Sequence, residues 1–230
     1  MENPKVFCLC VGGCGSKYLV QLLTENGIPG AFHEAAPAFD RLGIDYFNGK
    51  VSRSEAASRL AGTRDAISFE ASNRLFSLAD PISDAYPGSR FIFLFRDGRE
   101  SVRSIWSNPK IDDIMTERYR FREIARAPTG REISTLEKVC LYWSNINDRI
   151  LNDLKGKDHL FLSFEDLTAG RIDALQDFLG TSFERRTIPS VNEKPDLHGN
   201  RKPPYADWDQ ANKQAFDRLC GKTMMALGYF

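Results

Sequence analysis

The chain has 230 residues, 42% of them hydrophobic, and its 31 basic and 31 acidic side chains cancel to a formal net charge of zero. A chain of this length can bury roughly 70–75% of its unfolded surface, so we expect residues 1–230 to form one compact domain. A protein without net positive charge is not a general polyanion binder, and we expect no nucleic-acid partner.

Cysteines and apolar runs bear on metal chemistry and on location. The cysteines lie at positions 8, 10, 14, 140 and 220 without a nearby histidine, so we expect no metal site and interpret Cys8 and Cys10 as packing residues. The first residues lead into only a short apolar run, and no stretch approaches the length of a membrane span. We therefore expect no secretory signal, no membrane span and a cytoplasmic location. The sequence indicates no particular oligomeric state.

The first predicted element is a buried strand over 6–11, followed by a glycine-rich turn and a helix from Ser16 to about Glu25. An unbroken run of apolar and cysteine residues suits a strand that is covered on both faces. Glycines at 12, 13 and 15 let backbone N–H groups turn inward, and the helix points its positive end at the same place. This pattern predicts an anion site, the alternative being a tight turn without a ligand. A Walker A loop is excluded, because Lys17 follows a serine and precedes a tyrosine.

The next segments alternate between strands and helices. A strand over 28–32 ends in His33 and Glu34, at the kind of position where α/β sheets place their chemistry. A weak helical pattern follows over 39–47, and Ser52 with Glu55 forms a capping-box signal for a helix through 60. A strand over 66–70 then ends in Glu70, Asp80 is the predicted N-cap of a short helix, and a strand spans 90–95.

The second half continues the alternation. Helices are predicted to about 107, over 111–127, from the Ser134 capping box to about 154, over 173–179 and over 209–227, with a strand over 159–164 and a turn at 165–167. Trp143 falls on the apolar stripe of the long helix and is interpreted as packing. Arginines at 118, 120, 122, 126 and 131 predict a solvated charged face, the alternative being a basic lid. This order predicts an α/β fold, with a mostly parallel sheet of about five strands flanked by helices.

Residues 91–106 repeat the strand–turn–helix pattern, with a charged turn at 96–99 and Ser104 on the helix. Together with the glycine-rich turn, this segment resembles the sulfotransferases that use 3′-phosphoadenosine 5′-phosphosulfate (PAPS). In that family the first segment holds the 5′-phosphosulfate, and a strand ending R-D-P-R with a helical serine holds the 3′-phosphate. Residues 200–208 resemble the family's basic loop, which closes over the nucleotide. The resemblance implies a P-loop nucleotide-kinase-like fold.

The resemblance also implies a PAPS site that needs no metal. Backbone N–H groups of 13–17 and the Ser16 hydroxyl would hold the 5′-phosphosulfate, and Lys17 would stabilise the leaving group. The cofactor-binding residues that it implies are Gly13, Cys14, Gly15, Ser16, Lys17, Tyr18, Arg96, Ser104, Arg201 and Lys202. The alternative for Arg96 is a salt bridge to Asp97 or Glu165. Two positions depart from the family: Gly13 stands where a basic residue is usual, and Gly98 replaces a proline.

Sulfuryl transfer also needs a base for the acceptor hydroxyl. Glu34 has a placement similar to the catalytic glutamate of glycan sulfotransferases, Glu70 resembles a second family position, and His33 titrates near neutrality. We rank Glu34 first, Glu70 second and His33 third. Because neighbouring side chains on an extended segment point in opposite directions, we expect that His33 and Glu34 do not both face the site.

The sequence therefore predicts transfer of a sulfuryl group from PAPS to a hydroxyl of a carbohydrate or small metabolite. One alternative is a P-loop kinase acting on a nucleotide or small molecule, which the failed Walker A pattern disfavours. The other is a catalytically inactive protein that binds PAPS or its desulfated product PAP, suggested by the displaced lysine.

Overall fold

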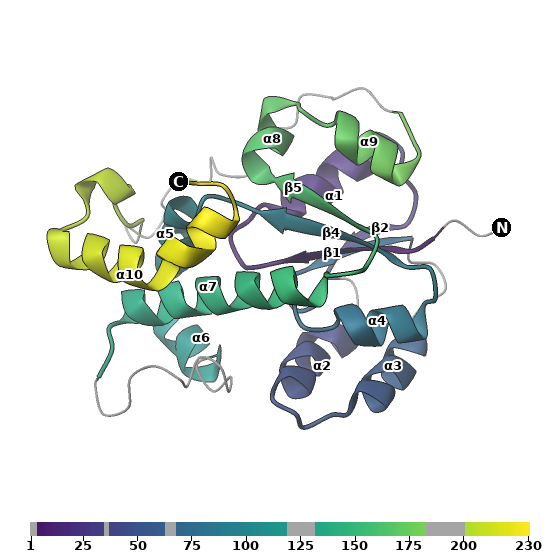
Figure 1. Ribbon diagram of the computed structural model, residues 1–230, viewed down its shortest axis with the longest axis horizontal. Coiled ribbons are helices and arrows are strands. Elements are labelled where there is room, and N and C mark those ends of the chain that lie inside the picture. The colour runs from purple at the N-terminus through teal and green to yellow at the C-terminus, as the bar shows by residue number, and fades with distance from the viewer. Residues whose placement is uncertain (1–3, 35–36, 63–67, 119–131, 183–200) are drawn as a thin grey trace.

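The computed structural model describes residues 4–34, 37–62, 68–118, 132–182 and 201–230 (Figure 1). These residues contain one sheet of five strands, all parallel, in the order β2-β3-β1-β4-β5. In chain order the strands are β1 (Val6–Cys10), β2 (Ala31–His33), β3 (Phe69–Ser72), β4 (Arg90–Phe95) and β5 (His159–Ser163). The predicted α/β fold with a parallel sheet is confirmed.

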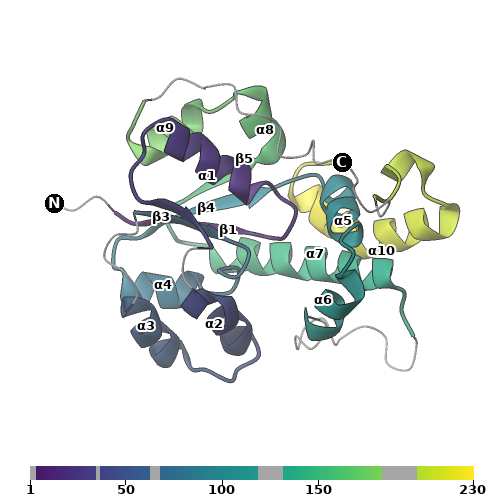
Figure 2. The ribbon, with the colours of Figure 1, turned by 180° about the vertical axis from the view of Figure 1, so that it is seen from behind.

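Helices cover both faces of the sheet, as Figures 1 and 2 show from opposite sides. One face carries α1 (Ser16–Glu25), α8 (Phe164–Ala169) and α9 (Asp173–Leu179). The other carries α2 (Pro37–Phe47), α3 (Arg53–Ala61), α4 (Ala79–Ala85) and the long α7 (Thr135–Asp153). Beyond the carboxyl ends of the strands lie α5 (Gly98–Trp106), α6 (Ile111–Arg118), the short 3-10 helix η2 (Tyr205–Asp207) and α10 (Gln210–Ala226).

The interior is built from the apolar runs of the sequence. Every residue of β1 is buried, and residues Phe91–Leu94 of β4 have no exposed surface. A central strand in a sheet covered on both faces has no side exposed to water, which explains its uninterrupted apolar pattern. Cys8, Cys10 and Trp143 lie in the same core, which confirms that they are packing residues.

Side-chain caps fix helix starts that the sequence predicts. The Ser134 hydroxyl accepts a hydrogen bond from the Glu137 N–H, and the Glu137 carboxylate accepts one from the Ser134 N–H, so α7 begins with a complete capping box. The Ser52 hydroxyl accepts from the Glu55 N–H at the start of α3. Helix α9 begins and ends at the predicted residues.

Two predicted strands are shifted along the chain. The strand predicted over 28–32 is β2 at Ala31–His33, and the one predicted over 66–70 is β3 at Phe69–Ser72, with 63–67 outside the described residues. The reason is register: Phe69 pairs with Val6 of β1 and with Ala31 of β2, so these strands start where their neighbours allow. Glu70 therefore lies inside a strand and not at its end.

Three helix predictions also change. Helix α4 begins at Ala79 after Leu78, so Asp80 is not the N-cap but lies in the first turn, 2.6 Å from the Lys157 ammonium. Residues 165–167 belong to α8 and not to a turn. Of the helix predicted over 111–127, α6 covers the part up to Arg118, and the arginines at 120, 122, 126 and 131 lie outside the described residues. Within the described ranges, no helix is long and apolar enough to cross a membrane.

Candidate functional site

A cavity of about 340 Å³ opens at the carboxyl ends of the strands. It is within the size range of small-molecule sites, which is about 300–1,000 Å³. Its lining comes from the loop after β1 and the start of α1, from the ends of β2, β3 and β4, and from α5 and α8. The lining residues are Gly12, Gly13, Gly15, Ser16, Lys17, Tyr18, His33, Glu34, Asn73, Arg96, Ser104 and Phe164.

The glycine-rich loop between β1 and α1 forms one wall of this cavity. Gly13 and Gly15 have φ angles of +78° and +97°, which favour glycine. A Cβ on Gly15 would lie 2.2 Å from the Phe164 ring, and one on Gly13 would lie 3.3 Å from the Ser104 hydroxyl. Glycine at these two positions therefore lets the loop approach α8 and α5. The first turn of α1 lies on the cavity, so the positive end of the helix faces it.

Cys14 is the one residue of the predicted loop site that does not line the cavity. Its side chain is buried beneath the loop beside Cys10. Burial, followed by the interaction with Cys10, raises the pKa of the Cys14 thiol well above its usual value. The thiol is therefore neutral under the loop and adds no negative charge to an anion site.

Arg96 forms the opposite wall, and its side chain is 14% exposed. Its guanidinium donates a hydrogen bond to the Gly13 carbonyl at 3.3 Å and lies 4.8 Å from the centre of the Phe164 ring. The predicted alternative was an ion pair with Asp97 or Glu165, but the carboxylate nearest to Arg96 among the described ion pairs is that of Glu100, at 3.7 Å. Ser104 lines the same wall from α5.

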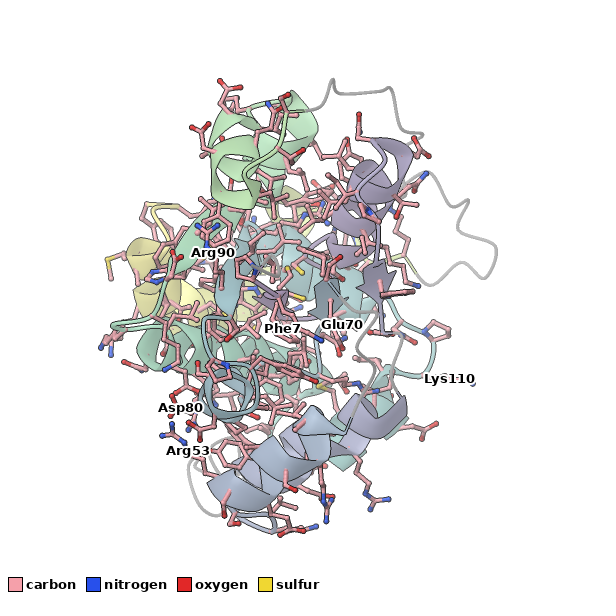
Figure 3. The ribbon with its side chains drawn as sticks, turned by 90° about the vertical axis from the view of Figure 1, so that its right-hand side faces the viewer. Phe7, Arg53, Glu70, Asp80, Arg90 and Lys110 are labelled. Carbon is pink, nitrogen blue, oxygen red and sulfur yellow. The ribbon has the colours of Figure 1, made fainter. Side chains whose placement is uncertain are left out.

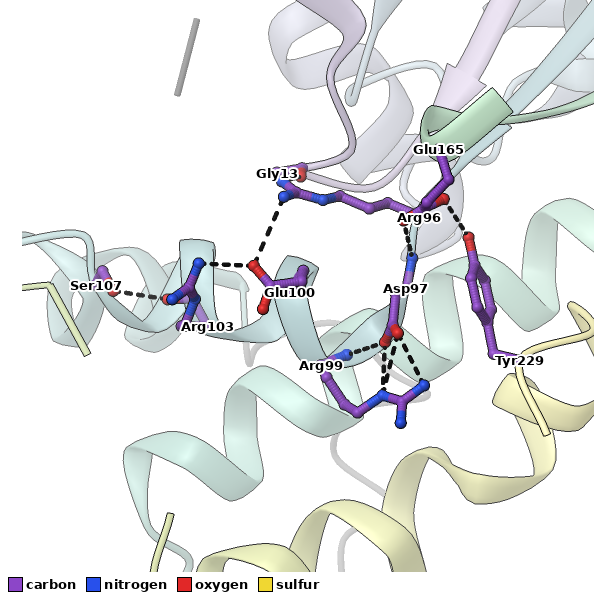
Figure 4. A network of polar contacts seen from close by, with 9 residues as sticks. All are labelled: Gly13, Arg96, Asp97, Arg99, Glu100, Arg103, Ser107, Glu165 and Tyr229. Atoms are coloured by element: carbon purple, nitrogen blue, oxygen red, sulfur yellow. Dashed lines mark hydrogen bonds and ion pairs between the residues drawn. The ribbon is translucent and has the colours of Figure 1, made fainter. Parts of the chain in front are cut away.

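A polar network surrounds Arg96 (Figure 4). Asp97 caps α5 by accepting from the Arg99 N–H at 2.8 Å, and it also pairs with the Arg99 guanidinium. The Asp97 N–H donates to Glu165 at 3.1 Å, and the second oxygen of this carboxylate accepts from the Tyr229 hydroxyl at 2.7 Å. Asp97 and Glu165 are therefore engaged with other partners, and the Arg96 guanidinium lies between the Gly13 carbonyl of the loop and the Glu100 carboxylate.

His33 and Glu34 both line the cavity, so the expectation that only one of them would face it is wrong. The cause is the backbone of Glu34, whose φ of +52° ends the extended alternation directly after β2. The His33 Nε2 lies 3.0 Å from the Ser16 hydroxyl, and its Nδ1 lies 3.9 Å from the Glu34 carboxylate. Burial lowers the pKa of His33 below its usual value, with Lys17 lowering it further and Glu34 opposing the change.

Glu70 is not brought to this cavity. It is fully buried in the middle of β3, where its neighbours in register are Phe7 on β1 and Phe32 on β2. Figure 3 shows Glu70 next to Phe7 in the interior of the molecule.

The basic segment of residues 201–208, called the late loop below, lies beside the cavity but does not line it. The Lys202 N–H donates to the Ser107 hydroxyl at 2.9 Å, and the Lys202 ammonium lies 4.9 Å from the centre of the Trp106 ring. Ser107 follows α5 directly and is one helical turn beyond Ser104. Arg201 and Lys202 are thus placed at the end of the helix that carries Ser104, outside the residues that line the cavity.

Two lining residues, Asn73 and Phe164, were not predicted from the sequence, and Gly12 was predicted only as part of the glycine-rich turn. Asn73 follows β3 directly, and the Asn73 Oδ1 is buried without a hydrogen-bond partner among the described residues. A predicted strand end at 72 in place of 70 would have placed Asn73 at the carboxyl edge of the sheet, where the site lies. The sequence pattern predicts Phe164 at the end of a strand, but it opens α8 and packs edge-on against Tyr18 with 5.8 Å between ring centres.

The described residues contain no group of three or more histidine, cysteine or acidic side chains that could hold a metal ion. The cavity instead offers two cationic side chains, three hydroxyl groups, one imidazole and one carboxylate. Cations, hydroxyl donors and a helix N-terminus are groups that bind phosphate or sulfate. The histidine and the carboxylate are groups that can accept a proton.

Comparisons with solved structures identify the fold. A sulfotransferase from Alicyclobacillus acidocaldarius matches with a TM-score of 0.51 and 17% identity over 99% of each chain. The sulfotransferase domain from the curacin biosynthetic pathway matches with a TM-score of 0.52 and 13% identity, over 100% of this chain and 99% of that domain. No family model and no curated protein matches the sequence. At this distance the likeness concerns the fold alone: the chain has the fold of these sulfotransferases.

Proposed function

We propose that this protein transfers a sulfuryl group from PAPS to a hydroxyl group of an acceptor. The observation that carries the proposal is the meeting of two sequence segments in one cavity. Residues 12–18 and the pair Arg96 and Ser104 lie far apart in the chain, and each resembles one half of a PAPS site. The fold shared with two sulfotransferases supports the same reading.

The nucleotide would lie between the loop and α5. The helix N-terminus and the Ser16 hydroxyl would bind the 5′-phosphosulfate, while Arg96 and Ser104 would bind the 3′-phosphate. Arg201 and Lys202, at the end of α5, would complete the site when the late loop closes over the nucleotide. Phe164 supports this arrangement, because its ring packs under the Arg96 guanidinium and beside the loop.

The reaction would be an in-line displacement at sulfur. The acceptor oxygen forms a new bond to sulfur, the bond from sulfur to the 5′-phosphate oxygen breaks, and its electron pair leaves with PAP. Lys17, exposed on the first turn of α1, would neutralise the charge that develops on this oxygen.

Glu34 is the residue that we propose as the base, and it would take the acceptor proton. Its carboxylate is 39% exposed on the cavity, whereas His33 is hydrogen-bonded to Ser16 of the loop. His33 would then position both Ser16 and Glu34. Glu70 is not proposed for this role, because it lies inside β3 away from the lining residues.

The acceptor would enter on the side of β2 and β3, where His33, Glu34 and Asn73 lie. These groups form hydrogen bonds with hydroxyls, so we propose a carbohydrate or another small hydroxyl-bearing metabolite as the acceptor. The orphan Asn73 Oδ1 supports an acceptor with more than one polar group, because a ligand donor would satisfy it.

Calorimetric titration tests the nucleotide part of the proposal. Purified protein is titrated with PAP, ADP and ATP, the latter two with and without Mg²⁺, alongside the variants Arg96→Ala and Arg59→Ala. Arg59 is a matched control, since it is exposed on α3 and its ion pair among the described residues is with Glu55 in the same helix. We expect metal-free binding of PAP that Arg96→Ala weakens by about tenfold or more and Arg59→Ala leaves unchanged.

Two outcomes would contradict the proposal. A preference for ATP with Mg²⁺ would favour a kinase of P-loop type. Tight PAP binding without release of PAP from PAPS across a panel of alcohols, phenols and sugars would indicate a binding protein without transferase activity.

A further inference from the structure

Tyr229 is linked to the chain on both sides of Arg96, directly at Phe95 and through Glu165 at Asp97. Its ring packs edge-on against Phe95, the residue before Arg96, with 6.1 Å between ring centres. Its hydroxyl donates to one oxygen of Glu165 at 2.7 Å, and the other oxygen of Glu165 accepts from the N–H of Asp97, the residue after Arg96. Figure 4 shows the chain of contacts from Tyr229 through Glu165 to Asp97.

We propose that Tyr229 and Glu165 are positioning residues for the 3′-phosphate site. They fix the peptide that joins Arg96 to Asp97, so that the Arg96 side chain extends toward Gly13 and the cavity and not along another direction. This inference rests on the proposed function, because it assigns the 3′-phosphate of PAPS to Arg96.

The fixed peptide lies where neither the sheet nor the helix supplies a partner. Register pairing between β4 and β5 ends with Phe95 and Ser163, and α5 begins at Gly98. The Asp97 N–H falls between these two elements and donates to Glu165 instead. A peptide at such a junction can rotate unless a side chain holds it, and a carboxylate that is itself held by a second donor holds it in one orientation.

The hydroxyl of Tyr229 also suits this task chemically. Burial and the hydrogen bond to Glu165 raise the pKa of Tyr229 above its usual value, so the phenol keeps its proton and remains a donor. Its hydrogen bond also occupies the Glu165 oxygen that the Asp97 N–H does not use. Both oxygens of the Glu165 carboxylate are thus occupied, which holds this carboxylate in one orientation.

The test compares binding of PAP with binding of adenosine 5′-monophosphate, which lacks the 3′-phosphate. The ratio of the two dissociation constants reports on Arg96, whereas general damage to the fold would affect both nucleotides. We expect Tyr229→Phe, which keeps the ring, to reduce this preference for PAP about threefold to tenfold and to leave monophosphate binding nearly unchanged. In an Arg96→Ala background the same substitution should have no further effect on the ratio.

Matched variants separate positioning from stability. Tyr86→Phe also removes a hydroxyl that donates a hydrogen bond, in this case to the Leu60 carbonyl at 2.6 Å. This bond joins the end of α4 to α3, outside the cavity, so the substitution should leave the ratio unchanged. Glu165→Gln should largely keep the preference, because its amide oxygen can accept from Asp97 while its NH₂ donates to the Tyr229 oxygen. Glu165→Ala should lose the preference as Tyr229→Phe does.

The outcomes for the two proposals are distinguishable. If the wild type prefers PAP, Arg96→Ala abolishes that preference and Tyr229→Phe does not reduce it, the positioning role is wrong and the proposed function stands. An equal reduction in Arg96→Ala and wild-type backgrounds would also overturn it, because the effect would not act through Arg96. If the wild type shows no preference for PAP over the monophosphate, both proposals fail together.

Discussion

The Nε2 of His33 lies 3.0 Å from the hydroxyl oxygen of Ser16, which joins the end of β2 to the first residue of α1. This contact connects the part of the cavity that we assign to the nucleotide with the part that we assign to the acceptor. His33 is 15% exposed in its side chain, so its protonation state depends on its surroundings as well as on the solution.

The first prediction concerns the pH dependence of stability. Burial lowers the pKa of His33 in the folded protein, so the unfolded chain binds the proton more readily. Stability should therefore be complete above the unfolded value of about 6.5 and should fall as the pH drops through the lower folded pKa. Urea unfolding of wild type and His33→Gln between pH 7.5 and 5.5 measures this. We expect the free energy of unfolding to fall more steeply with decreasing pH in the wild type than in His33→Gln. Equal slopes for both proteins would contradict a lowered pKa of His33.

The second prediction concerns the leaving group. Lys17→Met should lower the rate of PAP release from PAPS by about 100-fold, because no other cation lines the cavity on the first turn of α1 among the described residues. Release is measured by chromatography with water or an accepted alcohol as the acceptor. Lys222→Met, on the exposed face of α10, is the control and should behave as wild type. An unchanged rate for Lys17→Met would remove this residue from the mechanism.

The third prediction concerns the glycine loop. Gly15→Ala should destabilise the protein by about 3 kcal/mol or more. The backbone at this residue has a φ of +97°, and the added Cβ would lie 2.2 Å from the Phe164 ring. Gly27→Ala provides the comparison, because its φ is +79° but nothing lies within 4 Å of the added Cβ. Gly27→Ala should lower the free energy of unfolding by only about 1 kcal/mol, through backbone strain alone. Similar losses in urea unfolding would show that the contact with Phe164 carries no energy.

The fourth prediction concerns Gly98, which stands where the R-D-P-R pattern of the PAPS-using sulfotransferases has a proline. A Cβ on Gly98 would lie 2.8 Å from the Met224 sulfur and 2.8 Å from the Trp143 ring, and the Gly98 N–H faces that sulfur. Gly98→Ala should therefore destabilise by about 1–3 kcal/mol through overpacking. In the double variant with Met224→Ala the loss should be smaller than the sum of the single losses, because the cavity made by one change accepts the methyl added by the other. Strict additivity in denaturant unfolding would contradict this explanation.

Much of the fold could be predicted from local sequence features. The capping box of Ser134 and Glu137, the run over 173–179 and the apolar run over 90–95 each predicted an element at or near its observed bounds. These signals act between residues close in the chain, through hydrogen bonds at a helix start or through continuous burial of a strand. The glycine-rich turn and the Arg96 segment also lie on one cavity, as two strand ends of one parallel sheet should.

The tertiary structure decided the details of the site. Pairing with Val6 moved the start of β3 to Phe69, which placed Glu70 inside the sheet and Asn73 on the cavity. The left-handed backbone of Glu34 turned two adjacent side chains into the same space, against the alternation of an extended strand. Tyr229 reached Glu165, which lies 64 residues earlier in the chain. Sequence by itself thus determined which elements form, because their signals are local, whereas register and long-range contacts decided which side chains meet.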